Sequence, residues 1–134
     1  GAHTFLARLH ELNVPRAVAT SSSGTKARRL LQKTGLMRFI QHVTGGDEVN
    51  AGKPAPDVYI DAAKKLGIAP KHCLALEDSN NGTTAALAAG MPVIQIPDLA
   101  PSNRLPKPPD FNICCNLREA ASLIGLPLDD HLKP

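Results

Sequence analysis

Aromatic residues are scarce in this chain of 134 residues: tryptophan is absent, and tyrosine and phenylalanine together make up 3% of the sequence. Proteins that bind nucleic acid by base stacking need exposed aromatic rings, so this class is disfavoured. Hydrophobic residues still account for 43% of the chain, so its core must be built mainly from Leu, Ile, Val and Ala. An aliphatic core of this kind is typical of helices packed on buried strands.

Cysteines are few, odd in number and without the spacing of a metal site: Cys73, Cys114 and Cys115. Each lies in an apolar run, so we expect all three to be small core residues in a reducing compartment. No signal-peptide pattern is visible, and no apolar stretch is long enough to span a membrane. These absences predict a cytoplasmic protein with no membrane partner.

Neither sign of charge dominates, since the net charge is +3. The densest positive pairs, Arg28-Arg29 and Lys64-Lys65, lie in predicted helices and are expected on solvated faces. A mild positive balance helps to attract phosphate esters, but it does not indicate a nucleic-acid partner.

Helical and strand-like apolar patterns alternate along the chain. Residues 97–110 contain five prolines and are expected to form a surface loop. The alternation predicts an α/β fold whose mostly parallel sheet is covered by helices on both faces. Helices are predicted at 2–12, 25–34, 56–66, 81–89 and 117–124, and short strands at 16–20, 42–44, 73–76, 92–96 and 112–115.

Polar residues follow three of the predicted strands. Thr20 and Asp47 each come after a strand, and the pair Glu77-Asp78 comes after another. In sheets of parallel strands, ligands bind beyond the carboxyl ends of the strands. We therefore expect these residues to converge on one rim of the sheet.

The adjacent carboxylates Glu77 and Asp78 have two interpretations. Hard oxygen ligands at a strand end suit Mg²⁺, which takes one or two carboxylates plus water and substrate phosphate. The alternative is a helix cap, since Asp78, Ser79 or Asn80 could begin the helix that follows.

The turn that begins at Thr20 and continues through Ser21, Ser22 and Ser23 also has two interpretations. Hydroxyl and backbone N–H groups before a helix can hold phosphate oxygens. An ordinary serine-rich turn with one capping hydroxyl has the same composition.

A lysine follows in the loop Gly52-Lys53-Pro54. A lysine that points into a site neutralises a phosphoryl group, whereas most loop lysines are solvent-exposed. The five histidines show no paired spacing, so a zinc site is not expected, and neither a nucleophile elbow nor a Walker loop occurs.

In this order, the three segments resemble the motifs of the haloacid dehalogenase-like (HAD) hydrolase superfamily. The likeness covers residues 1 to about 98, with weaker support to residue 124. Further stretches are similar to the subgroup that contains β-phosphoglucomutase and pseudouridine-5′-phosphatase-like enzymes: residues 35–39, residues 54–57 and residues 85–92.

The resemblance implies a Rossmann-like three-layer sandwich and a Mg²⁺-dependent phosphatase or phosphomutase. In this family an aspartate attacks the phosphorus and forms an aspartyl-phosphate, which water then hydrolyses. Thr20, with Ser21 and Ser22, would bind the transferring phosphoryl group. Lys53 would bind that group and orient the nucleophile, while Glu77 and Asp78 would hold Mg²⁺. The substrate would be a small phosphorylated metabolite, a sugar phosphate or a nucleotide.

One family feature has no counterpart in this sequence. Members carry a strand that ends in Asp-x-Asp-Gly and a helical cap, and neither is found here. We expect residues 1–126 to be a partial HAD core with residues 127–134 as a tail, and the chain alone to be inactive.

The strand without a counterpart is central in the family, so its absence leaves a gap about 10 Å wide, twice the usual strand spacing. The gap lies between the strands that end at Thr20 and Leu76. We expect these open edges to pair directly, to take a strand from another chain through strand exchange or oligomerisation, or to belong to a longer polypeptide.

Three other interpretations of the same residues stay open. The chain could be a non-catalytic α/β module that binds a phosphorylated ligand or partner through Thr20 and Lys53. A degraded family member with only a structural role is another. A receiver-like signalling domain is less favoured, because no acidic pair precedes Thr20.

Overall fold

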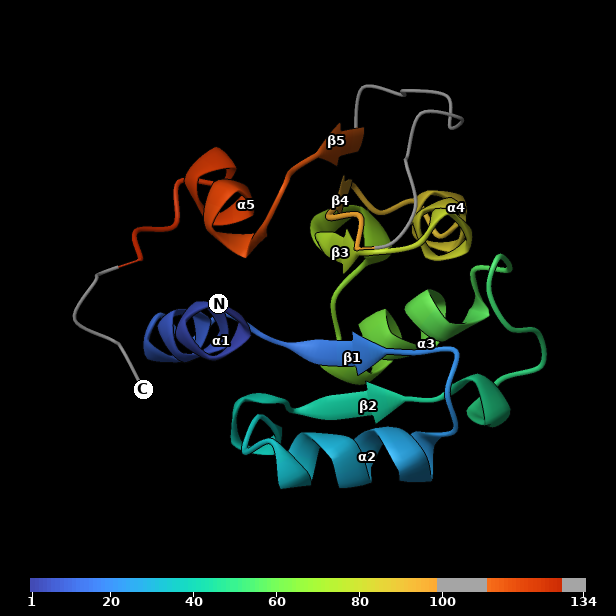
Figure 1. The fold of residues 1–134 in the computed structure, drawn as a ribbon. Helices are drawn as coiled ribbons and strands as arrows, with labels where there is room; N and C mark the ends of the chain where they lie inside the picture. The colour runs from blue at the N-terminus through green and yellow to red at the C-terminus, as the bar shows by residue number, and fades with distance from the viewer. Residues whose placement is uncertain (99–110, 129–134) are drawn as a thin grey trace.

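The computed structural model describes residues 1–98 and 111–128. Helices alternate with short parallel strands along the chain (Figure 1), which confirms the predicted α/β class. Within these two ranges, three single 3₁₀ turns join them, at Met37–Phe39, Gly46–Glu48 and Pro70–His72. The elements are α1 (Ala2–Glu11), β1 (Ala17–Ala19), α2 (Gly24–Lys33), β2 (His42–Thr44), α3 (Asp57–Leu66), β3 (Ala75–Glu77), α4 (Asn80–Ala88), β4 (Val93–Gln95), β5 (Phe111–Ile113) and α5 (Leu117–Leu123).

Local sequence signals set the ends of the helices. Ser23 caps α2 by accepting a hydrogen bond from Lys26 N–H, and Asn116 caps α5 by accepting one from Glu119 N–H. Such side chains replace the missing partners of the first helical N–H groups. At the C-terminal end of α3, Gly67 has φ of +70°, a conformation that glycine adopts without steric cost. Capping therefore explains why the predicted helix bounds are close to the observed ones.

The strands of the described residues form two separate parallel sheets. β1 pairs with β2, while β3 pairs with β4 and β4 with β5. Helix α3 packs against β1 and β2 and also touches α4, which covers β3 and β4. Within the described residues no ladder joins β1 to β3. The structure therefore does not close the expected gap by direct pairing of these strands.

A cavity of about 540 Å³ lies between the facing edges of β1 and β3. Apolar side chains line it, among them Val18 of β1, Leu76 of β3 and Leu9 of α1. The gap that the family resemblance predicts is thus present as an apolar cavity in this chain. How it is covered in solution stays a prediction.

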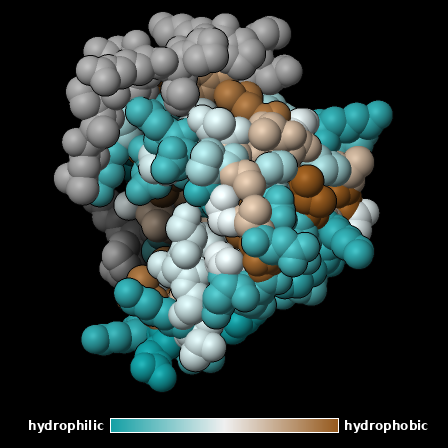
Figure 2. Space-filling model, turned by 90° about the vertical axis from the view of Figure 1, so that its right-hand side faces the viewer, coloured by the Kyte–Doolittle hydropathy of each residue, from teal (hydrophilic) through white to brown (hydrophobic). Residues whose placement is uncertain are grey.

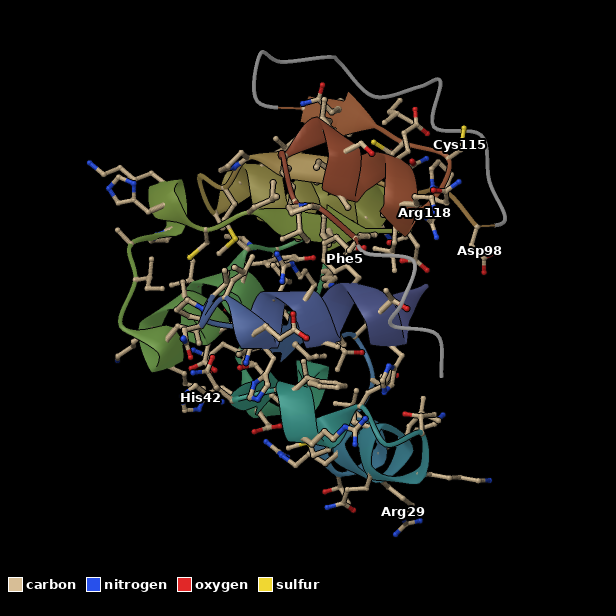
Figure 3. The ribbon with its side chains drawn as sticks, turned by 90° about the vertical axis from the view of Figure 1, so that its left-hand side faces the viewer. Phe5, Arg29, His42, Asp98, Cys115 and Arg118 are labelled. Atoms are coloured by element: carbon tan, nitrogen blue, oxygen red, sulfur yellow. The ribbon has the colours of Figure 1, made fainter. Side chains whose placement is uncertain are left out.

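The core surrounds this cavity on two sides. One cluster joins Val58 of α3 to Ala86 of α4 and Val93 of β4, all at most 1% exposed. A second joins α1 to α5: Phe5 points from α1 toward α5 (Figure 3) and packs against Ala121 and Leu126. A third joins Ile94 of β4 to Cys114 and to Ala120 of α5. These helices hold the two sheets together although no strand among the described residues bridges them.

Two details differ from the expectations. Glu77 is the last residue of β3 rather than the first residue after it, because Ile96 N–H donates to its carbonyl and lengthens the ladder. The expectation that all three cysteines are core residues is wrong for Cys115, which is exposed and points outward (Figure 3), while its neighbour Cys114 is buried.

Part of the predicted tail contacts the core. The Arg8 side chain donates to the carbonyl of Pro127 at 3.1 Å, and Leu128 packs beside the α1–α5 cluster. The rest of the tail, and most of the predicted 97–110 loop, lie outside the described residues. Among the residues described, no helix has the length and apolarity that crossing a membrane requires.

Candidate active site

Lys53 links the two sheets at the rim where β1 and β3 end. Its ammonium donates to the carbonyl of Ala19 at 3.1 Å and forms a buried ion pair with Glu77 Oε1. The side chains of Lys53 and Glu77 are only 8% and 5% exposed. The alternative of an exposed loop lysine therefore does not describe this structure.

Glu77 Oε1 accepts a second hydrogen bond, from the hydroxyl of Tyr59 in α3. The Tyr59 ring also lies beneath the lysine, with its centroid 4.9 Å from Lys53 Nζ, a cation–π contact. Three side chains from a loop, a helix and a strand thus meet at one carboxylate oxygen.

Charge and burial act in opposite directions on these groups. Burial alone would raise the pKa of Glu77, but the hydrogen bonds from Lys53 and Tyr59 and the lysine charge outweigh it and lower that pKa. Burial, followed by the negative charge of Glu77, raises the pKa of Tyr59 well above its usual value. At neutral pH Glu77 is therefore the acceptor and the Tyr59 phenol the donor.

The other oxygen of Glu77 lies over the first turn of α4. Ser79 caps this helix, accepting from Gly82 N–H at 3.0 Å, so the capping alternative for this segment holds for Ser79. Contacts from Ser79 N and Oγ to Glu77 Oε2, at 3.5 and 3.4 Å, are longer than good hydrogen bonds. A Cβ on Gly82 would lie 1.9 Å from Oε2, so only glycine leaves room for the carboxylate.

The turn after β1 contains one helix-capping serine and other hydroxyl groups that do not cap the helix. Ser23 is the cap of α2, while Thr20 Oγ1 accepts from Ser22 N–H at 3.1 Å. The Ser22 amide is thereby used inside the turn, so Ser22 can offer a ligand its hydroxyl but not this N–H. Ser21 and Ser22 are exposed and Thr20 is partly buried. In the described chain no hydrogen bond joins Thr20 to Lys53; they are neighbours through Ala19.

Two glycines let the loop after β2 approach this turn. A Cβ on Gly46 would lie 2.7 Å from the Ser21 carbonyl oxygen, and one on Gly45 would lie 2.1 Å from Gly24 N. Asp47, which the sequence places at the rim, accepts a hydrogen bond from Gly24 N–H at 2.9 Å and so supports the start of α2. Figure 2 shows this face, toward which β1 and β2 point, as mostly hydrophilic to intermediate in hydropathy.

The carboxylates of Glu77 and Asp78 could supply some of the ligands that a Mg²⁺ ion requires. From the part of the chain that the structure describes, Glu77 Oε2 receives only long contacts, and Asp78 next to it is exposed. Mg²⁺ is commonly held by one or two carboxylates with water and substrate phosphate, so this pair fits such a site. Nowhere in residues 1–98 or 111–128 do three or more His, Cys, Asp or Glu side chains gather as a metal-binding group.

Sequence reasoning did not single out Tyr59 or Gly82. Tyr59 is the only tyrosine of the chain, and its place near the start of the helix after Lys53 was the one available signal. Gly82 stood in a run of small residues and had no signal of its own. Only the packed structure shows that both shape the surroundings of Glu77.

Comparison with known proteins agrees with this fold. A model of the haloacid dehalogenase-like hydrolase family matches residues 1–90, about two thirds of the chain. The chain therefore belongs to the haloacid dehalogenase-like hydrolases.

Individual relatives point to the subgroup that the sequence motifs indicate. The chain is 42% identical over 104 residues to a probable pseudouridine-5′-phosphatase of Drosophila melanogaster, covering 73% of this chain and 45% of the relative. It is 38% identical over 82 residues to the fructose-1-phosphate phosphatase YqaB of Escherichia coli, covering 61% and 44%.

Among solved structures, the fold is similar to CbbY of Rhodobacter sphaeroides in complex with xylulose-1,5-bisphosphate. The TM-score is 0.81 at 29% identity, over 94% of this chain and 57% of that chain. The chain thus spans about half the length of the relatives it matches.

Proposed function

We propose that this chain forms the phosphoryl-binding and metal-binding side of a phosphatase or phosphomutase that acts on a small phosphate ester. The observation that carries the proposal is the position of the Lys53 ammonium, bonded to both Ala19 and Glu77 where two strands end. This position brings one cation next to the hydroxyl turn and the acidic pair. Relatives named as a fructose-1-phosphate phosphatase and a hexitol phosphatase, both of Escherichia coli, support the substrate class.

Each residue has a distinct task in this proposal. Within the described residues Lys53 uses two of its three ammonium donors, which leaves one N–H for a phosphoryl oxygen. The Thr20 hydroxyl accepts from Ser22 and can donate its own proton to the same group, with Ser21 and Ser22 beside it. A cation and fixed donors at this point stabilise the charge of a transferring phosphoryl group.

Glu77 and Asp78 are the residues that would hold Mg²⁺. When bound, the ion supplies further positive charge to the phosphoryl oxygens. The aspartate nucleophile of the aspartyl-phosphate route has no counterpart in these 134 residues, so we expect the chain alone to bind but not to turn over. A cytoplasmic location is part of the same proposal.

Two measurements test the proposal on the 134-residue chain. Calorimetry with inorganic phosphate and MgCl₂ should show binding that Lys53→Ala abolishes and Thr20→Val weakens. Lys64→Ala, on an exposed position of α3, is the matched control and should bind as the parent chain does. Circular dichroism establishes that each variant is folded.

Phosphate release from p-nitrophenyl phosphate, with Mg²⁺, tests the expected inactivity. Turnover by the chain that Lys53→Ala removes would overturn that expectation while supporting the site. Phosphate binding that survives both Lys53→Ala and Thr20→Val in folded protein would overturn the site itself.

A further inference from the structure

Lys53, Tyr59 and Glu77 form a buried polar cluster. The proposed function gives a task to Lys53 and Glu77 but none to the Tyr59 hydroxyl. Tyr59 is 7% exposed and lies in the first turn of α3. Its ring would fill the same space and contact Lys53 without the hydroxyl, as a phenylalanine does. The hydroxyl must therefore be explained by its bond to Glu77.

Glu77 Oε1 receives its two hydrogen bonds from Tyr59 and Lys53. A carboxylate oxygen has two lone pairs, so this oxygen is saturated. Among the described residues, Oε2 has only the two long contacts from Ser79, which hold it weakly. The two hydrogen bonds at Oε1 thus fix the rotation of the Glu77 carboxylate. Without the tyrosine hydroxyl, Lys53 would be the only strong donor to this carboxylate among the described residues.

Lys53 depends on that orientation. Its ammonium is held between the Ala19 carbonyl at 3.1 Å and Glu77 Oε1, so a rotated carboxylate would draw the ammonium away from Ala19. We propose that Tyr59 is a positioning residue, whose hydroxyl fixes the Glu77 carboxylate and thereby keeps the Lys53 ammonium beside Ala19 at the rim. This inference rests on the proposed function, in which Lys53 binds the phosphoryl group.

Tyr59→Phe is the decisive variant, because it removes the donor and keeps the ring. Brief labelling of amines with acetic anhydride, read for each lysine by mass spectrometry, measures how well Lys53 is held. In the parent chain Lys53 should react far more slowly than exposed Lys64 on the same molecule. Tyr59→Phe should raise the Lys53-to-Lys64 labelling ratio about fivefold, the factor expected for one hydrogen bond.

A double-mutant cycle separates positioning from general loosening. In a Glu77→Gln background, Tyr59→Phe should produce no further change, because the tyrosine acts through the carboxylate. An unchanged ratio in Tyr59→Phe overturns the proposal. An equal increase of the labelling ratio in both backgrounds also overturns it, as does a parallel increase in the labelling of Lys65. Either result would indicate a general loosening of α3.

A second measurement needs no Glu77 variant in case that protein does not fold. Tyr59 is the only tyrosine and tryptophan is absent, so intrinsic fluorescence reports this residue alone. Hydrogen bonding to a carboxylate quenches tyrosine, so emission should be weaker in the folded chain than in urea. Emission equal to that of the unfolded chain would show that the Tyr59–Glu77 bond is absent and overturn the proposal.

Inorganic phosphate makes the two proposals separable in the same experiment. Phosphate should slow the labelling of Lys53 in the parent chain if Lys53 binds the phosphoryl group. Absence of this protection, with the Tyr59→Phe effect intact, counts against the proposed function and leaves the positioning of Lys53 established. Protection without a Tyr59→Phe effect supports the proposed function and overturns the positioning role of Tyr59.

Discussion

At the scale of single residues, the Glu77 carboxylate is the point on which the site depends. It pairs with a buried lysine, accepts from a buried tyrosine and fills the space left by a glycine. Removing one partner of a buried ion pair costs about 3–5 kcal/mol, because the other charge is left uncompensated. Small changes that displace this carboxylate should therefore have large effects.

Gly82→Ala is such a change. Alanine is favoured over glycine in a helix by about 1 kcal/mol, but its Cβ would lie 1.9 Å from Glu77 Oε2. The carboxylate would have to leave Lys53 and Tyr59, and this loss outweighs the gain in helix propensity. We expect a net destabilisation of about 2–4 kcal/mol, measured by urea unfolding at pH 7.

Gly52→Ala is the matched control. A Cβ at Gly52 meets no atom within 4 Å, so its effect should stay within about 0.5 kcal/mol. If Gly82→Ala proved as stable as Gly52→Ala, the Glu77 carboxylate would not occupy the position described.

The candidate site also shows what could be predicted for single residues. Order along the chain and position after strands were enough to select Thr20, Lys53 and the acidic pair. The burial of Glu77 was not predictable. Successive side chains on a strand point to opposite faces, so when the strand extends by one residue, Glu77 lies on the face opposite to that of the residue before it. The sequence predicted Glu77 just past the strand, whereas in β3 it contacts Tyr59 of α3.

At the scale of elements, α3 is fixed to β2 by a small polar group. The Thr44 hydroxyl, fully buried, donates to Asp61 Oδ2 at 2.7 Å, and Lys65 donates to both residues at 3.0–3.1 Å. The hydrogen bond from Thr44, and after it the bonds and charge of Lys65, lower the pKa of Asp61 although burial opposes them.

The sign of the resulting pH dependence follows from this lowered pKa. A carboxyl group with a lower pKa in the folded state stabilises the fold at pH values above its ordinary pKa, near 3.9. That contribution is lost as the pH falls through the folded-state pKa. Asp61→Asn should therefore destabilise the chain by about 1 kcal/mol at pH 7 and by less at pH 2.

Urea unfolding at both pH values measures this difference. Glu11→Gln is the control, because the Glu11–Arg8 pair lies on the surface of α1 and should contribute little at either pH. An Asp61→Asn effect of equal size at pH 7 and pH 2 would show that ionisation of Asp61 is not what links α3 to β2.

The elements themselves were largely predictable. Every predicted helix and strand is present among the described residues, with ends shifted by at most two positions, because periodic apolar residues and capping signals act locally. The three 3₁₀ turns were not predicted, since a single turn has no periodicity to detect. Family likeness, rather than periodicity, predicted the gap in the sheet.

At the scale of the whole molecule, the cavity between the sheets determines how this chain should behave alone. Thr20 N–H donates to the carbonyl of Thr44, so alternation along β1 turns the backbone groups of Ala17 and Ala19 toward the cavity. Ala75 and Glu77 bond to β4 by the same pattern, so Leu76 presents its backbone groups to the cavity from the other side. Unpaired edges next to apolar side chains favour association with another strand.

We expect the 134-residue chain to associate with itself at high concentration and to bind an apolar dye such as ANS. Sedimentation velocity between low and high micromolar concentrations should show the average mass rising. Ala17→Pro removes an N–H that faces the cavity and leaves the β1–β2 hydrogen bonds in place, so it should weaken association without abolishing it. The β3 edge remains open in this variant, which is why some association should persist. A constant monomer mass at every concentration, with no dye bound, would mean that the helices α1 and α3 already shield both edges.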